Sequence, residues 1–430
     1  MKKSVYELVQ NRLDFIFKEF DNIYISFSGG KDSSVLLNLC IDYMRKKHIK
    51  RKIGVFHIDY EAQYQMTTDF VDQTFQKNQD ILEFYRICLP LKAQCATSMY
   101  QSYWLPWNLE EKDIWVRNMP KNCINEENQQ FNFYLKGMWD YDFQKQFGLW
   151  YHTYKKAKKT IDLIGIRSQE SLNRWRSIYS DKSYKIYKNR NWIKPSYELQ
   201  NVFNGYPIYD WRTEDIWVAN AKFGWEYNKL YDLYYQAGLD INQMRVASPF
   251  NDCAIDTLKL YKAIDPNNWA KMVGRVNGAN FSSIYGGTSA TGWKSITLPP
   301  NYTWEKYMYF LLDTLPEKTK QVYLQKLNTS IKFWREKGGV LSEETIQKLK
   351  SRGINVEVVP KTNYHTNKKP VKMEYLDSID IPEFKEIPTY KRMCICIMKN
   401  DHLCKYMGFS QTKEEILKRK ESIKKWKNLI

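Results

Sequence analysis

No stretch of the sequence is apolar over the roughly 18 residues that a membrane-spanning helix needs. Its opening, MKKSVYELVQNRLDF, also lacks the continuous apolar core of a secretory signal peptide. Eight cysteines occur in 430 residues, and their irregular spacing is not that of a disulfide scaffold. We therefore expect a cytoplasmic protein with reduced thiols and no membrane segment.

The charges are unbalanced toward the basic side. Lys and Arg number 66 against 48 Asp and Glu, which gives a formal net charge of +18. Such an excess favours a polyanionic partner such as DNA or RNA, although a solvated basic surface is the alternative. Two segments combine basic and aromatic residues and are candidate nucleic-acid contacts, residues 181–195 and the lysine-rich helix expected at 412–427. A surface loop and a solvated helix are their alternatives.

The stretch most informative about chemistry is residues 23–34, IYISFSGGKDSS. Residues with β-strand character run into a glycine turn, and an apolar segment at helical spacing follows over residues 35–44. A strand, a glycine turn and a helix together direct backbone N–H groups at an anion, and glycine lets phosphate approach closely. The spacing is not that of a Walker A loop. The candidate nucleotide-binding residues here are Ser28, Gly29, Gly30, Lys31, Asp32 and Ser33.

Strands and helices alternate along the first part of the chain. We expect strands at residues 23–27, 52–59, 81–89 and 160–166, and helices at 4–19, 35–44, 65–77 and 131–158. Residues 97–130 read as an irregular insertion, and residues 206–220 as a short strand with a helix that begins at Thr213. This alternation predicts an α/β fold with a parallel sheet that binds its ligand at the carboxyl ends of the strands.

Two further side chains lie at predicted strand ends. Asp59 follows the second strand, where a carboxylate can hold Mg²⁺ or a ribose hydroxyl, with a helix cap as the alternative. Glu61 and Gln63 are weaker candidates. Arg167 follows the strand at 160–166, and its guanidinium suits a phosphate or sulfate group. Glu170 is placed to orient Arg167, unless the two form only a structural ion pair.

Four motifs in sequence order now carry a resemblance to a known family. SGGKDS, HIDYE, GIRSQES and YPIYDWRTEDIW together resemble the phosphoadenosine phosphosulfate (PAPS) reductase family of the ATP pyrophosphatase (adenine nucleotide α-hydrolase-like, PP-loop) superfamily, over residues 20–250. GRVNGANFSSIYGG and LPPNYTWEKYMYFLL resemble the C-terminal region of unknown function (DUF3440) of a bacterial subgroup. Members of that subgroup are described as PAPS reductase-like or sulfurtransferase proteins and often occur beside a ParB-like nuclease-fold protein. The resemblance implies a PP-loop fold, ATP with Mg²⁺, and a ParB-like partner.

The chain also departs from true PAPS reductases. These carry a degenerate loop and a catalytic cysteine in a C-terminal tail, whereas here the loop is intact with Lys31 and residues 405–430 contain no cysteine. The intact loop is similar to that of ATP sulfurylase small subunits and of the sulfurtransferase of DNA phosphorothioation. We therefore expect cleavage of ATP to pyrophosphate and an adenylate, followed by sulfur transfer or another modification, with Lys31, Asp32 and Arg167 as catalytic residues.

Two other functions stay open at this point. The first is a nucleotide-sensing regulator that acts with DNA and the ParB-like partner. The second is a genuine PAPS reductase that uses Cys253 or Cys404.

The C-terminal part is expected to form its own region. We place a domain boundary near residue 295, between a PAPS reductase-like domain with insertions (1–295) and a mainly helical basic region (296–430) with helices at 303–313 and 317–337. Four soft ligands within the latter form a CxC-x5-HxC pattern that suits Zn²⁺ or a metal cluster, with an apolar helix or strand carrying buried cysteines as the alternative. These ligands are Cys394, Cys396, His402 and Cys404. The sequence assigns no role to Cys40, Cys88, Cys95 or Cys123.

Overall fold

The computed structural model describes residues 4–98, 101–179, 186–196, 201–246, 248–251, 254–276, 279, 298, 302–360 and 368–409. The chain divides into two compact units. The first comprises residues 1–94, 103–178 and 183–276, and the second comprises residues 95–102, 179–182 and 277–430. Residue 295, where we placed the domain boundary, lies outside the described residues, as do residues 412–427 and Cys253.

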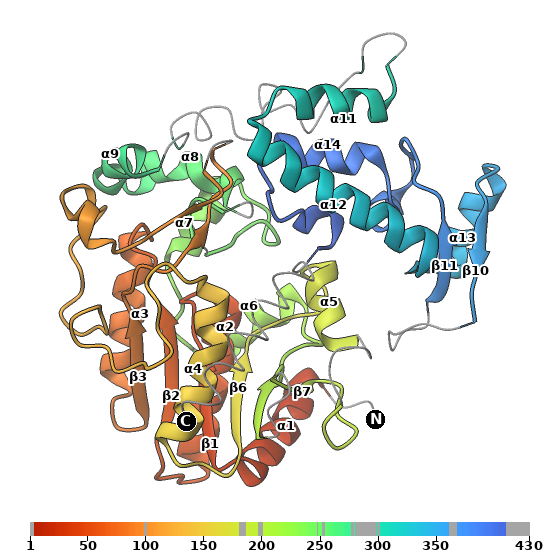
Figure 1. Ribbon diagram of the computed structural model, residues 1–430. Coiled ribbons are helices and arrows are strands. Elements are labelled where there is room, and N and C mark those ends of the chain that lie inside the picture. The colour runs from red at the N-terminus through yellow and green to blue at the C-terminus, as the bar shows by residue number, and fades with distance from the viewer. Residues whose placement is uncertain are drawn as a thin grey trace. The chain divides into compact units, whose positions relative to one another are not determined.

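The first unit is built from alternating helices and strands (Figure 1). Its elements are α1 (Val5–Glu19), β1 (Asn22–Ser26), α2 (Lys31–Lys46), β2 (Ile53–Ile58), α3 (Gln65–Lys77), β3 (Leu82–Ile87), β4 (Ala93–Gln94), β5 (Tyr103–Trp104), η1 (Leu109–Ile114), α4 (Asp140–Tyr154), β6 (Thr160–Ile164), α5 (Leu172–Tyr179), β7 (Ile193–Pro195), β8 (Val202–Gly205), α6 (Thr213–Phe223), α7 (Leu230–Gln236), α8 (Ile255–Ile264) and α9 (Pro266–Arg275).

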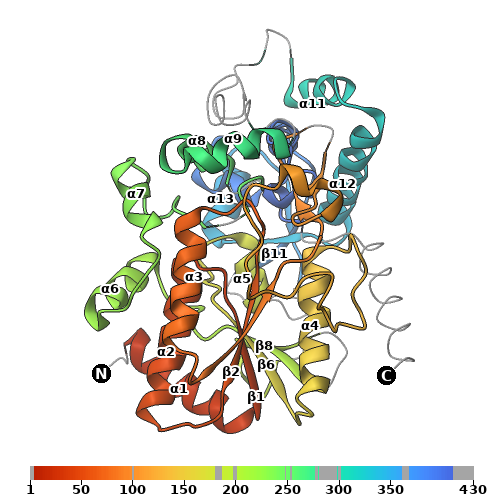
Figure 2. The ribbon, with the colours of Figure 1, turned by 90° about the vertical axis from the view of Figure 1, so that its left-hand side faces the viewer.

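A six-stranded sheet lies at the centre of this unit, with the strand order β3-β2-β1-β6-β8-β7. Only the β7–β8 pair is antiparallel among its strand pairs, and β1 lies between β2 and β6 with Tyr24 opposite both Gly54 and Asp162. Helices α1, α2 and α3 lie on one side of the sheet and α4 on the other (Figure 2). The predicted α/β fold is therefore confirmed, because parallel neighbours joined through helices require covering layers on both faces.

The face of the sheet toward α4 carries an aromatic core. Tyr24, Phe56 and Tyr85 of adjacent strands pack against Phe147 and Tyr151 of α4, with 4.3 Å between the ring centroids of Phe56 and Phe147. Because side chains alternate along a strand, these rings all point to the same face. Aromatic burial on this scale contributes much of the stability of the sheet.

Two of the predicted elements need correction. The helix predicted over residues 131–158 spans only Asp140–Tyr154, because Phe131 and Phe133 insert into the aromatic core from a turn. The short strand expected within residues 206–220 is also wrong. The chain forms turns there, and the strand that joins the sheet, β8, comes just before it. In both stretches, the aromatic residues are spaced as in a regular helix or strand, but they pack against other parts of the fold instead.

The second unit is mainly helical, as predicted, and also contains a three-stranded antiparallel sheet of order β10-β11-β9 that the sequence did not reveal. Its elements are α11 (Trp304–Asp313), α12 (Glu317–Glu336), β9 (Gly339–Leu341), α13 (Glu343–Ser351), β10 (Val356–Val358), β11 (Lys369–Met373), η2 (Pro382–Glu386), α14 (Tyr390–Met398) and η3 (Lys405–Met407). No helix in the described part of the chain has both the length and the apolar character that crossing a membrane requires.

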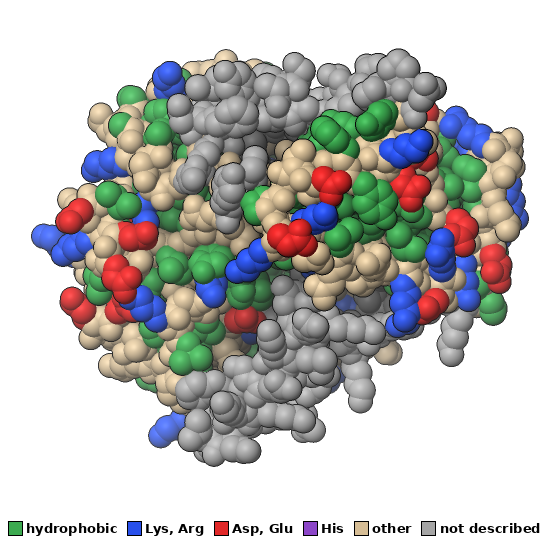
Figure 3. All heavy atoms as spheres, turned by 45° about the horizontal axis from the view of Figure 1, so that its top comes forward, with side chains coloured by type: hydrophobic (Ala, Val, Ile, Leu, Met, Phe, Trp, Pro, Cys, Tyr) green, Lys and Arg blue, Asp and Glu red, His purple; other side chains and the backbone are tan. Residues whose placement is uncertain are grey.

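Charges of both signs share the surface on the face shown in Figure 3, where basic and acidic side chains are interspersed among hydrophobic ones. On that face, the net positive charge of the chain is therefore not gathered into one region among the described residues.

A buried carboxyl beside the central strand gives a first prediction. Asp162 accepts hydrogen bonds from Ser26 Oγ at 2.9 and 3.0 Å, and burial raises its pKa to about 7. The folded state therefore holds a proton that the unfolded state has already released between pH 4 and 7, so stability falls as pH rises through this window.

Replacing Asp162 with Asn should remove this pH dependence. In the wild type it lowers the free energy of unfolding by about 4 kcal/mol between pH 4 and 7. Urea unfolding of both proteins at pH 5 and pH 8 measures it, and the titration of other groups cancels in the difference. Parallel pH profiles of the two proteins would show that Asp162 does not titrate in this range.

Candidate functional site

The glycine turn joins the end of β1 to the start of α2. Gly29 has a φ of +74°, and a Cβ atom there would lie 3.0 Å from Cγ2 of Val71. Gly30 is the N-cap of α2, and no side chain caps the helix at that position. Glycine is therefore required at residue 29 by both backbone conformation and space, and the turn leads directly into the N-terminus of a helix, which favours an anion.

Two serines hold the turn in shape. The backbone N–H of Ser28 donates to Ser33 Oγ at 3.2 Å, and the two hydroxyl oxygens are 3.0 Å apart. Ser28 Oγ in turn accepts from the backbone N–H of Gly30 at 3.2 Å, while Ser33 Oγ donates to the carbonyl of Gly30 at 3.1 Å. The sequence-predicted serines thus lie within the turn and fix its geometry.

The segment around α7 covers this turn. Asn228 Nδ2 donates to the carbonyl of Gly29 at 3.2 Å, and the ammonium of Lys31 donates to the carbonyl of Met244 at 3.1 Å. The hydroxyl of Tyr231 accepts from the backbone N–H of Lys31 at 2.9 Å. Burial lowers the pKa of Lys31. The hydroxyl oxygen of Tyr231 therefore already accepts from the first backbone N–H group of α2, where a phosphate oxygen would bind.

Arg167 joins the turn from the neighbouring strand. It follows β6, and its Nε lies 2.5 Å from Asp32 Oδ1, while its Nη1 donates to Thr213 Oγ1 at 3.1 Å. Gly165 permits this approach, since a Cβ atom there would lie 3.0 Å from the backbone of Asp32. Asp32 also lies 3.4 Å from the ammonium of Lys31. One carboxylate thus holds two buried cations at the N-terminus of α2.

Glu170 makes a weaker contact than predicted. It lies 3.8 Å from Nη2 of Arg167 and forms a closer ion pair with Arg174, which lies four residues further along the chain in α5. Asp32, rather than Glu170, is the main partner of Arg167.

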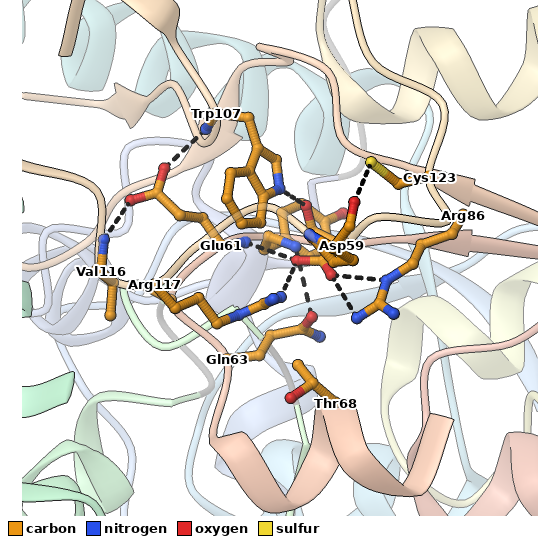
Figure 4. Close-up of polar contacts among 12 residues, drawn as sticks. Asp59, Glu61, Gln63, Thr68, Arg86, Trp107, Val116, Arg117 and Cys123 are labelled. Carbon is orange, nitrogen blue, oxygen red and sulfur yellow. Dashed lines mark hydrogen bonds and ion pairs between the residues drawn. The ribbon is translucent and has the colours of Figure 1, made fainter. Parts of the chain in front are cut away.

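Asp59 occupies a different environment from the one expected for a metal or ribose ligand. It is fully buried, and its carboxylate pairs with Arg86 at 2.9 Å and with Arg117 (Figure 4). The backbone N–H of Glu61 donates to Asp59 Oδ1 at 3.0 Å. The two guanidinium groups lower the pKa of this carboxyl although its burial opposes the shift. Both of its oxygens are therefore used within the protein.

The neighbouring carboxylate, Glu61, anchors the insertion in the same way. Its oxygens accept from the backbone N–H groups of Trp107 at 2.7 Å and Val116 at 3.0 Å, and they pair with Arg275 of α9 at 2.9 Å. Asp59 and Glu61 together fix residues 104–117 to the carboxyl end of β2.

Sequence reasoning missed several members of these networks. Arg86 was readable, because an arginine within the apolar strand ILEFYRICL signals a buried ion pair. Tyr231 and Asn228 carried no such signal, because they reach the turn from about 200 residues away in the chain.

The predicted zinc ligands do not form a metal site. Cys394 and Cys396 lie two residues apart on α14, so their side chains point to different faces of the helix. His402 Nε2 contacts the carbonyl of Ser98 at 3.2 Å. Among the residues that the structure describes, no three His, Cys, Asp or Glu side chains come together as metal ligands. The alternative, an apolar helix with buried cysteines, is confirmed.

Removal of the Tyr231 hydroxyl gives a second prediction. This oxygen also accepts from the backbone N–H of Val246, so Tyr231→Phe leaves two donors available at the turn. A bound phosphate no longer has to displace a hydrogen bond worth about 1 kcal/mol, so affinity for ATP should rise by about fivefold. Calorimetric titration measures it, with Tyr235→Phe as control because Tyr235 is exposed. Weaker binding would instead indicate that the Tyr231 hydroxyl contacts the nucleotide.

Comparison with known proteins yields two family matches. Residues 22–238 match the phosphoadenosine phosphosulfate reductase domain, and residues 238–418 match a domain of unknown function, DUF3440. The uncharacterized protein YbdN of Escherichia coli (strain K12) is 32% identical over 416 residues, which cover 96% of this chain and 92% of YbdN.

Solved structures match more distantly. A PAPS reductase from Candida auris in a phosphate complex is 15% identical, with 54% of this chain and 93% of that one covered and a TM-score of 0.28. The Candida glabrata FMN adenylyltransferase in complex with ATP is 14% identical, with 53% of this chain and 57% of that one covered and a TM-score of 0.31. The U34-tRNA thiolase NcsA from Methanococcus maripaludis is 12% identical, with 63% and 76% covered and a TM-score of 0.30.

Proposed function

This chain belongs to the phosphoadenosine phosphosulfate reductase domain family, and from that premise we propose that it is an enzyme that binds ATP at residues 28–33 and splits it into pyrophosphate and an adenylated intermediate. The observation that carries the proposal is the convergence of Lys31 and Arg167 on one carboxylate, Asp32, at the N-terminus of α2. Two buried cations beside a glycine turn suit a polyphosphate far better than they suit a neutral ligand.

The proposed chemistry follows from where these charges lie. An oxygen of the acceptor attacks the α-phosphorus of ATP, and the bond to the bridging oxygen of the β-phosphate breaks with its electron pair. Backbone N–H groups at the start of α2 and the Lys31 ammonium stabilise the departing pyrophosphate, and Arg167 holds negative charge from the adjacent strand. Asp32 positions both cations. A sulfur nucleophile then displaces AMP from the adenylated acceptor.

The described residues do not fit a resident Mg²⁺. Asp59, the predicted ligand, is paired with two arginines, and Asp32 is paired with Arg167. Carboxylates neutralised in this way have little capacity left for a hard cation. Mg²⁺ accompanying ATP stays a prediction.

The acceptor class that we favour is a nucleic acid. The net charge of +18 supports a polyanionic acceptor. Charges of both signs are mixed on the face shown in Figure 3, so that face does not suit the binding of a polyanion. The basic-aromatic segments stay candidates, with residues 181–185 and 412–427 outside the described part of the chain. A ParB-like partner likewise stays a prediction.

One observation favours a nucleotide sensor as a second candidate. The turn is covered by α7 and its flanking residues, and Lys31 is only 3% exposed. A closed site of this kind also suits binding without turnover. By contrast, Cys404 is completely buried in the second unit, which does not suit the mobile catalytic cysteine of a PAPS reductase.

The test is an assay of pyrophosphate release by the purified full chain with ATP and Mg²⁺, alone and with DNA or tRNA. We expect release that increases with one of the two polymers. Tight ATP binding without release would favour the sensor. Sulfite release from PAPS with thioredoxin would favour a reductase.

A further inference from the structure

Two loops of the first unit are rich in positive charge and contain no carboxylate. Residues 45–52, which run from the last turn of α2 to β2, read RKKHIKRK and include six Lys or Arg side chains. Residues 155–159, which join α4 to β6, read KKAKK and include four lysines. We call these two loops together the basic edge. Eight of its ten cationic residues are exposed, and Arg51 and Lys159 are half-buried.

The sheet brings the two loops to one edge. β2 and β6 are the neighbours of β1, and both run parallel to it. Because parallel strands begin at the same edge of a sheet, the loops before β2 and β6 are separated by two strand spacings, about 10 Å. Figure 1 shows the amino ends of these strands at the lower side of the first unit, and this edge is turned away from the viewer in Figure 3. The mixed charges seen in Figure 3 therefore do not describe the basic edge.

Asp21, between α1 and β1, ties the two loops together. Its backbone carbonyl accepts a hydrogen bond from Arg51 Nη1 at 2.7 Å. Its carboxylate accepts from the backbone N–H groups of Lys158 and Lys159 at 2.8 and 2.7 Å. The spacing of the two loops is therefore fixed by hydrogen bonds to one residue.

Carboxylates neutralise a minority of these cations. In the part of the chain that the structure describes, Lys47 pairs with Asp14 at 3.8 Å, Lys155 with Glu83 at 2.5 Å and Lys159 with Glu19 at 2.6 Å. Three of the ten cations thus have an acidic partner, which leaves seven. Even when the carboxylates of Asp21 and Asp80 in the adjoining loops are added to those three, ten positive charges stand against five negative ones.

The other cations are held by neutral groups or by none. Arg45 donates to the side-chain oxygen of Asn78 at 2.8 Å, and Lys52 donates to the backbone carbonyl of Gln79 at 2.6 Å. Such contacts fix a side chain in place without cancelling its charge. Four exposed lysines have neither an ion pair nor a side-chain hydrogen bond among the described residues, namely Lys46, Lys50, Lys156 and Lys158. These four are available to an external anion.

The composition of the edge favours a nucleic acid over an anionic membrane. Peripheral membrane binding usually combines basic residues with several inserted apolar side chains. Among the exposed large hydrophobic side chains of the described part of the chain, Tyr154 is the one that adjoins these loops. Its ring is 55% exposed and stacks on Trp150 with 4.8 Å between the ring centroids. A single supported ring beside lysines suits the stacking of a nucleobase.

We propose that the basic edge binds the sugar-phosphate backbone of a nucleic acid. Cations on a rigid edge contact phosphates, which position a polymer without reading its sequence. The five residues of β1 separate this edge from the glycine turn by about 17 Å. The inference therefore does not depend on ATP cleavage, and the bound phosphates are not those that react at the turn.

The test measures binding of a fluorescent DNA duplex and of tRNA by anisotropy, without ATP and over a series of KCl concentrations. One variant carries Lys46→Gln, Lys50→Gln, Lys156→Gln and Lys158→Gln together, which breaks no ion pair of the described fold. Each lost phosphate contact lowers the slope of log affinity against log salt by about 1, so we expect that slope to fall by about 3–4. Affinity at about 0.1 M KCl should fall by at least about tenfold.

A matched variant removes the same charge from the second unit. It carries Gln in place of four exposed lysines, Lys306, Lys318, Lys337 and Lys350, and should keep the wild-type slope. An unchanged slope in the basic-edge variant, or equal losses in the two variants, would overturn the proposal. Binding of the wild type to phosphatidylserine vesicles but to neither polymer would also overturn it.

Acetylation of lysines in the wild-type chain provides a readout that needs no variant. With DNA or tRNA bound, acetic anhydride should modify Lys46, Lys50, Lys156 and Lys158 more slowly, as measured by peptide mass spectrometry. Equal rates with and without the polymer that binds would contradict the proposal. Salt-dependent binding without any pyrophosphate release would count against the proposed ATP chemistry alone.

Discussion

Replacing Lys31 with Met should lower the rate of pyrophosphate release by about 10²–10³-fold, which is the usual effect of removing one preorganised charge from a transition state. Lys31 is buried at the start of α2 and lies 3.4 Å from Asp32. Met retains most of the volume of the side chain and removes its charge together with the hydrogen bond to the carbonyl of Met244. We expect kcat to fall more than affinity for ATP, because the charge on pyrophosphate develops as the bond breaks. Initial rates at saturating ATP measure this effect.

Lys47→Met serves as the matched control. Lys47 follows the same helix at its other end, is about half exposed and makes a 3.8 Å ion pair with Asp14. The same change of charge there should leave the rate unaltered. Equal losses in both variants would indicate that net charge, rather than the position of Lys31, governs the reaction.

Replacing Asp59 with Asn should destabilise the fold by about 3–5 kcal/mol, because two buried guanidinium groups lose their common partner. Folded domains are typically stable by only about 5–15 kcal/mol, so the loss is large. Urea unfolding monitored by circular dichroism measures it. The result distinguishes the network seen here from the role predicted from sequence. A metal or ribose ligand would instead lose ATP affinity at nearly unchanged stability.

Asp72→Asn is the control for this variant. Asp72 pairs with the same arginine, Arg86, but its side chain is 47% exposed. Exposed ion pairs contribute about 0–1 kcal/mol, so the loss should be correspondingly small. An Asp59 variant no less stable than the Asp72 variant would contradict the structural role of Asp59.

The sequence predicted the sheet and the glycine turn because both depend on local patterns. Alternating apolar strands and amphipathic helices determine the order of elements, and Gly29 with Gly30 indicates close backbone approach. The helix 65–77 was predicted with the bounds observed for α3. Asp32 and Arg167, chosen from separate motifs, are brought into contact because their strands are neighbours in the sheet.

The remaining features depend on contacts that a single sequence does not encode locally. Asp59 has the position of a ligand at the end of β2, but its partner Arg117 comes from an insertion 58 residues away. Tyr231 reaches Lys31 across 200 residues. Ile124 is brought beside Ile87 by a single bridge at the end of β3, for which no periodic pattern exists. Long-range contacts therefore determine which side chains surround the turn, whereas the local sequence pattern determines the turn itself.

The most direct test of the central claim is ³¹P NMR of the products formed from ATP by the wild-type chain and by Lys31→Met, in the presence of the polymer that stimulates release. Cleavage between the α and β phosphates predicts pyrophosphate together with AMP or an adenylated acceptor in the wild type, and neither in the variant. Formation of ADP and phosphate, or ATP bound but unchanged in the wild type, would contradict the claim that residues 28–33 catalyse adenylation.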